Sequence, residues 1–225
     1  MKAADRTPAT AVLVFGDARL PRALSALETH RNPGQADIDA AAQTHRRLVV
    51  AGDDTHLAQV LTRLLRTERL DVEVGYVPRR RTHATRAYRL PAGRRAVRRA
   101  LRAGARRVPL IRDETGTAIV GRARWLPAAE APAIRGEAVV DDTVLFDGDV
   151  AEVWIEPTAL IPGLRAALPG RFRWTRWTRS VRWVGGRAAQ LGTTGAVVVR
   201  DEVPGPRTVR RSTFYRNVEG WLLVR

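Results

Sequence analysis

The sequence contains no cysteine and only one lysine, Lys2, among its 225 residues. The lack of cysteine excludes disulfide bonds, thiolate catalysis and zinc sites with sulfur ligands, and it agrees with a reducing compartment. Long hydrophobic runs are also missing, because the longest, such as 11–15 and 221–224, fall far short of the roughly 20 residues that cross a bilayer. The first residues lack the apolar segment of a signal peptide. Together these absences predict a cytoplasmic protein.

With so little lysine, almost all the positive charge is carried by arginine. The formal net charge is +16 and apolar residues make up 44% of the chain, which predicts a folded core under a basic surface. Such a surface attracts nucleic acid, acidic lipid headgroups or phosphorylated small molecules, and the planar guanidinium suits bidentate phosphate contacts. A coding sequence biased toward G and C would give the same composition without any binding role.

The first half of the chain alternates strand-like and helix-like segments. The predicted strands are 11–15, 48–50 and 72–77, and the predicted helices are 20–27, 57–65 and 94–103, with a polar loop over 30–35. Strands interleaved with helices predict an α/β domain with a parallel sheet and flanking helices.

The second half consists of short apolar or alternating runs separated by turn residues, from 108–111 to 221–224. Strands without comparable helices between them predict a β-rich, sandwich-like domain. A boundary near Arg106 therefore divides the chain into domains 1–106 and 107–225.

The turn after the second strand, Ala51-Gly52-Asp53-Asp54-Thr55, is the strongest candidate site. Gly52 would let the backbone approach a ligand, Asp53 could orient a metal ion or hydroxyl, and Thr55 could cap the next helix or bond a phosphate oxygen. The same residue types also suit any strand-to-helix turn, so a purely structural role is the alternative.

The order of these elements and this turn resemble the diacylglycerol and sphingosine kinase-like family, whose fold is shared with NAD kinases. The family's Gly-Gly-Asp-Gly-Thr turn contacts nucleotide phosphates, and this chain matches it at Gly52, Asp53 and Thr55. The family's next motif, Gly-Thr-Gly-Asn-Asp, is replaced here by 80–84, Arg-Arg-Thr-His-Ala. The family's Asp-Gly-Glu turn corresponds to Asp201-Glu202-Val203.

The resemblance implies ATP-dependent phosphoryl transfer to a lipid hydroxyl, with Mg²⁺, by a protein at the inner face of the membrane. Asp54 adds a carboxylate where the family has glycine, which opposes phosphate binding, whereas the arginines after the third strand could replace the backbone amides. The implied catalytic residues are Asp53, Asp201 and Glu202, and the implied nucleotide-binding residues are Gly52, Asp54, Thr55, Arg79, Arg80, Arg81 and Thr82. The histidines are scattered, so no protein metal ligands are assigned.

The alternative function is that of a non-catalytic basic protein that binds nucleic acid or anionic lipid. A repeat over 173–184, in which Arg recurs at every third residue and Trp often follows it, would stack on bases or anchor in headgroups. The same repeat would also suit strands whose tryptophans fill a core while the arginines face water. ATP titration and salt-sensitive oligonucleotide binding separate the two functions.

Overall fold

The computed structural model describes residues 9–18, 20–169 and 181–225. The chain divides into two compact units, the first formed by Met1–Val108 together with Glu219–Arg225 and the second by Pro109–Val218. The first unit breaks off after Val108, two residues from the boundary expected near Arg106.

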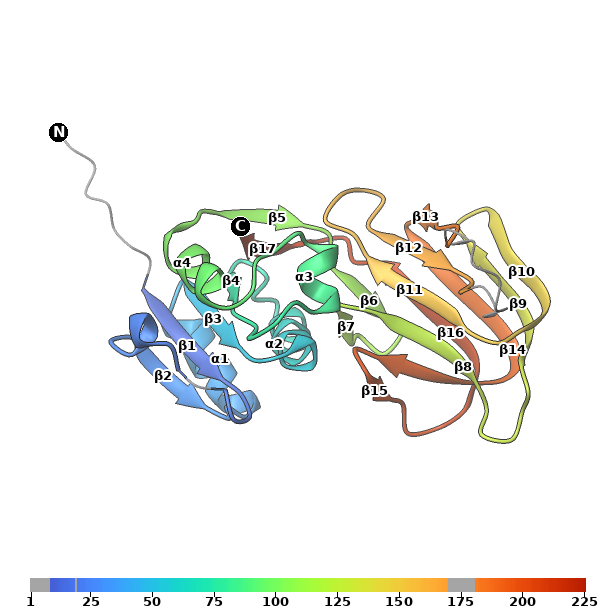
Figure 1. Cartoon of the computed structure of the whole chain (residues 1–225), viewed down its shortest axis with the longest axis horizontal. Coiled ribbons are helices and arrows are strands. Elements are labelled where there is room, and N and C mark those ends of the chain that lie inside the picture. The colour runs from blue at the N-terminus through green and yellow to red at the C-terminus, as the bar shows by residue number, and fades with distance from the viewer. Residues whose placement is uncertain (1–8, 19, 170–180) are drawn as a thin grey trace, which may run out of the picture. The chain divides into compact units, whose positions relative to one another are not determined.

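The first unit is built on a six-stranded sheet whose order is β2-β1-β3-β4-β17-β5 (Figure 1). All neighbouring strands are parallel except β5, which is antiparallel to β17. The strands are β1 (Thr10–Val14), β2 (Glu28–Arg31), β3 (Arg47–Ala51), β4 (Glu73–Tyr76), β5 (Ala105–Val108) and β17 (Trp221–Val224). Strands β1 and β3 are almost wholly buried, as their uninterrupted apolar sequences predict.

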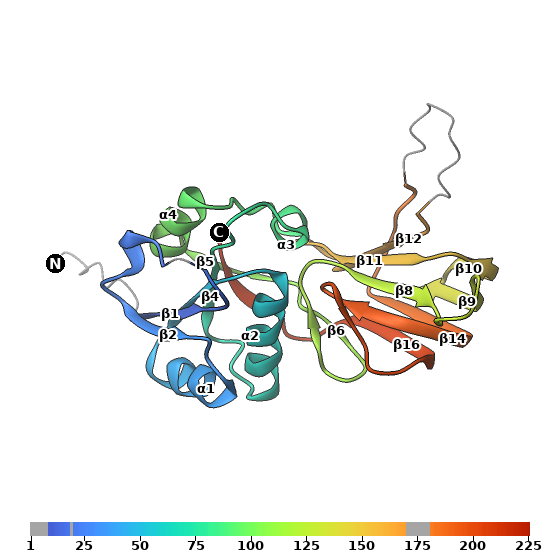
Figure 2. The ribbon, with the colours of Figure 1, turned by 60° about the horizontal axis from the view of Figure 1, so that its bottom comes forward.

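Helices cover both faces of this sheet (Figure 2). They are η1 (Arg22–Leu24), α1 (Gln35–Thr44), α2 (Asp54–Arg66), α3 (His83–Ala87) and α4 (Arg94–Arg102). Helices α1 and α2 lie on one face, and α4 lies on the other, where Ala96, Val97 and Ala100 join the core formed with β1 and β3. A Cβ at Gly75 of β4 would lie 3.0 Å from the Ala100 Cβ, so this glycine allows α4 to approach the sheet closely.

Three expectations for this unit were wrong. Only residues 22–24 of the predicted helix 20–27 are helical, and Glu28–Arg31, close to the predicted loop, is the edge strand β2. Edge strands are often short and polar, so β2 carries no apolar pattern. The last strand, β17, was expected in the β-rich domain but pairs with β4 and β5 of the first sheet.

The second unit is a large antiparallel sheet, so the predicted order of an α/β region followed by a β-rich region is confirmed. Its core includes Trp125 and Phe214, and the Trp125 indole N–H donates to Ser212 Oγ at 3.0 Å. Its strands are β6 (Ile111–Asp113), β7 (Ala118–Ile119), β8 (Ala123–Pro127), β9 (Ile134–Val140), β10 (Thr143–Val150), β11 (Val153–Pro157), β12 (Leu164–Ala167), β13 (Val184–Gly186), β14 (Ala188–Arg200), β15 (Val203–Pro204) and β16 (Val209–Arg216).

Most of the Arg/Trp repeat, including residues 173–180, lies outside the described residues. Trp183, at its end, is half-buried, and the Arg165 guanidinium lies 4.1 Å from the centre of its ring. Its ring centre is 6.4 Å from that of Trp154, over which the Arg122 guanidinium lies at 4.0 Å. The described end of the repeat therefore belongs to a cluster in which two neighbouring indole rings are each covered by one guanidinium group.

Candidate functional site

The turn between β3 and α2 is shaped by the side chain of Asp53. Asp53 is the N-cap of α2, and its Oδ1 accepts a hydrogen bond from the His56 backbone N–H at 3.1 Å. The same oxygen lies 2.6 Å from His56 Nδ1, and the Asp53 backbone N–H donates to that nitrogen at 3.3 Å, which completes a capping box. The carboxylate expected to act in catalysis therefore also begins the helix.

The imidazole of His56 lies directly over Gly52. A Cβ at Gly52 would lie 3.0 Å from His56 Nδ1, and the ring stacks on Phe15 with 4.7 Å between ring centres. The space that a glycine leaves for a ligand is thus filled by an aromatic side chain of the same turn. A change of the His56 rotamer would open this face of Gly52 to a ligand.

Asp54 joins the turn to the next strand and helix. Its Oδ1 accepts from the Tyr76 hydroxyl at 2.8 Å, and its Oδ2 accepts from the Ala84 backbone N–H at 3.0 Å. Burial, with the neighbouring Asp54 carboxylate as the second cause, raises the pKa of Tyr76 far above its ordinary value. Both oxygens of Asp54 are therefore engaged, while Thr55 lies in the first turn of α2.

The arginine loop, residues 79–81, follows β4 at the same edge of the sheet. The Val77 N–H donates to the Val50 carbonyl at 2.8 Å, which fixes the start of the loop beside the end of β3. Arg79, Arg80 and Arg81 are exposed and form no ion pair with any carboxylate in the described part of the chain. Their positive charges are thus available to an anion.

Thr82 ends this loop as the N-cap of α3. Its hydroxyl oxygen accepts from the Thr85 N–H at 3.2 Å, and the Thr82 N–H donates to Thr85 Oγ1 at 2.8 Å. Together with the Asp54–Ala84 hydrogen bond, these contacts bring the β3–α2 turn and the loop 79–82 to one place. The contacts join Asp54 to the start of α3, directly after Thr82, and whether the expected residues bind a nucleotide stays a prediction.

Asp201 and Glu202 belong to the second unit, in the turn between β14 and β15. The buried Asp201 carboxylate accepts from the backbone N–H groups of Val120, Gly121 and Arg122 at 3.0, 2.7 and 3.0 Å. Glu202 is exposed and lies 2.8 Å from an Arg124 nitrogen. Asp201 thus holds the segment that leads into β8, whereas Glu202 faces solvent.

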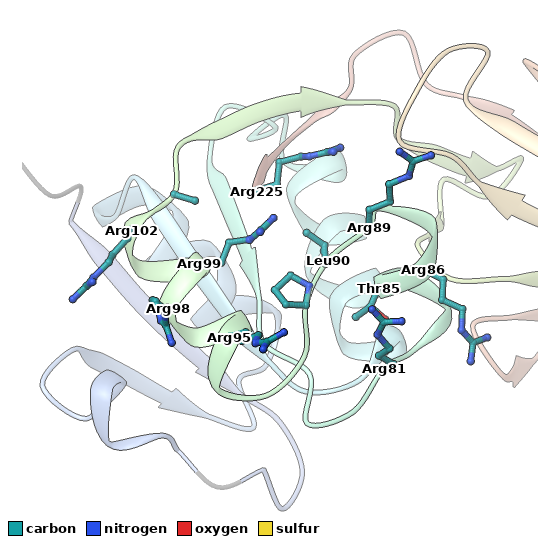
Figure 3. A pocket seen from close by; sticks show the side chains of 12 residues that line it. Arg81, Thr85, Arg86, Arg89, Leu90, Arg95, Arg98, Arg99, Arg102 and Arg225 are labelled. Atoms are coloured by element: carbon teal, nitrogen blue, oxygen red, sulfur yellow. The ribbon is translucent and has the colours of Figure 1, made fainter.

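A second basic feature, which sequence reasoning missed as a site, is a cavity of about 990 Å³ in the first unit (Figure 3). We name it the arginine cavity. Its lining comprises Arg81, Thr85, Arg86, Arg89, Leu90, Pro91, Arg95, Arg98, Arg99, Arg102, Ala103 and Arg225. The available signal was the run 94–102, which contains five arginines and no acidic residue.

The carboxylates of the described residues do not form a site for Mg²⁺. No group of three or more His, Asp or Glu side chains in that part of the chain could hold a metal ion. Asp54 is committed to two hydrogen-bond donors and Asp53 to the cap of α2. Magnesium chemistry at this edge would therefore depend on oxygens brought by a nucleotide.

No helix in the described residues is long and apolar enough to cross a membrane.

Two solved structures share the architecture of nearly the whole chain. A diacylglycerol kinase from Bacillus anthracis str. Sterne superposes with a TM-score of 0.69 and 11% identity, over 96% of this chain and 97% of that chain. This chain has the fold of the diacylglycerol kinases and NAD kinases. An NAD kinase from Archaeoglobus fulgidus in complex with ATP superposes with a TM-score of 0.63 and 14% identity, over 96% of this chain and 93% of that chain.

The lipid kinase and NAD kinase fold expected from the sequence is therefore confirmed. No protein-family model and no curated protein sequence matches the chain. At 11–14% identity the likeness establishes the fold, and the activity has to be argued from the site.

Proposed function

We propose that this protein binds the phosphates of ATP at the carboxyl edge of the first sheet and transfers the terminal phosphoryl group to a lipid hydroxyl. The observation that supports the proposal is the arginine loop, which follows β4 where the Val77 N–H bonds the end of β3 and whose guanidinium groups pair with no carboxylate of the described residues. In open α/β sheets ligands bind at the carboxyl ends of the strands. The structure of the NAD kinase with ATP supports a nucleotide for this fold.

In this proposal arginine replaces the glycine backbone as the phosphate clamp. Only Gly52 remains of the glycines in the family's turn, and His56 covers it. A guanidinium group offers planar paired donors to phosphate oxygens, so Arg79 and Arg80 can neutralise charge that backbone amides would otherwise meet. Arg81, Thr82 and Thr55 complete the set of candidate donors.

Phosphoryl transfer depends mainly on positioning and on neutralising charge, which these groups can supply. Magnesium bound with the nucleotide would add further charge neutralisation. Of the proposed catalytic carboxylates, Asp53 follows β3 as the N-cap of α2, and Glu202, which is exposed and pairs with Arg124, is proposed to accept the proton of the lipid hydroxyl. Asp201, with its three backbone donors, would act by holding the turn that carries Glu202.

The test is calorimetric titration of ATP, with and without Mg²⁺, against the wild type and two double variants. Arg79→Gln with Arg80→Gln should weaken ATP binding on the order of tenfold or more, because hydrogen bonds to charged groups contribute about 1.5–3 kcal/mol. Arg210→Gln with Arg211→Gln changes the net charge equally at two exposed positions of β16 and should leave the affinity unchanged. If both variants lose the same affinity for ATP, the binding is due to unspecific charge attraction and not to the arginine loop.

His56→Ala provides a second, opposite readout. The variant uncovers Gly52 and removes the stack on Phe15, which is worth about 0.5–1.5 kcal/mol, so ATP should bind about 2- to 10-fold more tightly. Unchanged or weaker binding would show that the Gly52 backbone takes no part. Transfer of labelled phosphate to diacylglycerol in mixed vesicles then tests the reaction itself.

The net charge of +16 favours one competing function, the non-catalytic binding of nucleic acid or anionic lipid. In that case a single-stranded oligonucleotide or an acidic vesicle would bind with steep salt dependence while ATP titrations stay flat.

A further inference from the structure

The arginine cavity gathers eight arginines and no acidic residue. They are Arg81, Arg86, Arg89, Arg95, Arg98, Arg99, Arg102 and Arg225. No salt bridge joins any of them to a carboxylate in residues 9–18, 20–169 and 181–225. Like charges that line one cavity repel one another, so a bound anion would relieve the repulsion as well as gain its own contacts.

One wall of the cavity is a fixed stripe on α4. Its four arginines are spaced i, i+3, i+4 and i+7, so they share one side of the helix and extend over about 10 Å. The opposite side of α4 is buried against the sheet through Ala96, Val97 and Ala100, and the stripe therefore cannot turn away. The buried Arg47 donates to the carbonyls of Ala100, Leu101 and Ala103 and so fixes the end of the helix.

The other wall is formed by the arginines of the loop 79–82, of α3 and of the segment that follows it (Figure 3). Arg89 lies there with a φ of 54°, in the left-handed region that glycine occupies at least cost. The Leu90 N–H donates to the Thr85 carbonyl at 2.8 Å, which closes α3 around this residue. An arginine at a position suited to glycine places a guanidinium on the cavity at a conformational cost, and such outliers often mark functional sites.

The lining also indicates which anion fits. It contains no aromatic ring on which bases could stack, which disfavours single-stranded nucleic acid. Its apolar members offer no exposed anchor for a bilayer, because Leu90 is only 5% exposed. The volume of about 990 Å³ is that of a site for a small molecule.

We propose that the arginine cavity binds a compact small molecule that carries several phosphoryl groups, at a site that shares Arg81 with the nucleotide edge proposed above and is otherwise formed by different residues. Phosphates spaced along such a ligand would bridge Arg95 and Arg99 of α4 to Arg89 on the other wall. A bound polyphosphate would link α4 to α3, two elements that are separated by the segment 88–93.

The test uses inorganic tripolyphosphate as the probe, in calorimetric titrations of the full chain. Arg95→Gln with Arg99→Gln should weaken its binding on the order of a hundredfold, about tenfold for each guanidinium group removed. Glutamine is a good helix former, so α4 should persist, and this is checked by circular dichroism. The matched control is Arg94→Gln with Arg106→Gln, two exposed arginines of the same unit outside the lining, which should change the affinity less than threefold.

Further measurements decide between the possible occupants. Saturating ATP should leave tripolyphosphate binding by the wild type within threefold, and the variant Arg79→Gln with Arg80→Gln should do the same. If ATP does not bind at all, the proposed function is refuted, while this site is unaffected. Equal losses in the cavity variant and its control would overturn the proposal. So would tighter binding, abolished by the cavity variant, of a single-stranded oligonucleotide or of vesicles that contain a phosphorylated inositol lipid, because the occupant would then be nucleic acid or membrane.

Discussion

Replacing Arg47 by methionine should lower the free energy of unfolding of the first unit by about 3–5 kcal/mol, the range observed when one partner of a buried ion pair is removed. The Arg47 side chain is 5% exposed, and its Nη2 lies 2.6 Å from a Glu73 oxygen. Its guanidinium also donates to three carbonyls at the end of α4 at 3.0, 3.3 and 3.0 Å. Methionine keeps much of the apolar stem but removes the buried donor of Glu73 and of these carbonyls, and leaves Glu73 only its longer contact with Arg46.

The neighbouring residue provides a matched control. Arg46 reaches the same Glu73 at 3.6 Å, but its side chain is 76% exposed, so Arg46→Met should cost less than about 1 kcal/mol. The double variant Arg47→Met with Glu73→Met should recover part of the loss, because no buried charge is then left alone.

Urea unfolding followed by helical circular dichroism measures these differences. All α-helices in the described residues lie in the first unit, so the signal reports on that unit rather than on the β-rich one. If the free energy of unfolding falls with urea concentration at the same slope in all variants, the substitutions change stability and not the compactness of the unfolded state. Losses for Arg47→Met and Arg46→Met that agree to within about 1 kcal/mol would refute the view that burial makes this ion pair important.

Three further predictions concern other parts of the chain. Gly220→Ala should destabilise the first unit by about 1–3 kcal/mol or more, because its Cβ would lie 2.2 Å from the Val108 carbonyl oxygen, whereas Gly104→Ala, with nothing within 4 Å, should be tolerated; thermal melts compare the two. The raised pKa of Tyr76 means that the folded state keeps its proton longer than the unfolded chain, so stability is complete below about pH 10 and falls above it. Tyr76→Phe should reduce this loss of stability above about pH 10, measured by denaturation at several pH values. The same loss in the variant would contradict its assignment to Tyr76. Asp201→Asn should lower the free energy of unfolding of the second unit by about 1–3 kcal/mol, since a neutral amide accepts hydrogen bonds from the three backbone N–H groups less well. Unfolding followed by tryptophan fluorescence measures this loss, and a value near zero would show that these hydrogen bonds are unimportant.

The sequence predicted those elements whose burial is encoded locally. Uninterrupted apolar runs marked β1 and β3, and apolar residues at helical spacing marked α2, because each pattern is repeated within a few residues. The polar edge strand β2 has no such pattern. The partner of β17 was also unpredictable, since a short apolar strand looks the same whichever sheet it joins.

The site was predicted only as far as chain order allows. The carboxyl ends of neighbouring parallel strands had to bring Gly52 and the arginine loop together. The position of His56 between Gly52 and Phe15 depends on side-chain packing between segments distant in sequence, and no spacing rule reveals it. The arginine cavity likewise needs α4, α3 and Arg225 to meet, although the basic run 94–102 was visible.

The place of β17 between β4 and β5 has a consequence for biosynthesis. While the ribosome makes the second unit, β4 and β5 have been translated but the strand that joins them has not, so the nascent first unit keeps two unpaired edges. We expect this unit to reach its final protease resistance only after residues 221–224 emerge. Pulse proteolysis of stalled chains would show it, and early resistance would mean that the remaining strands suffice.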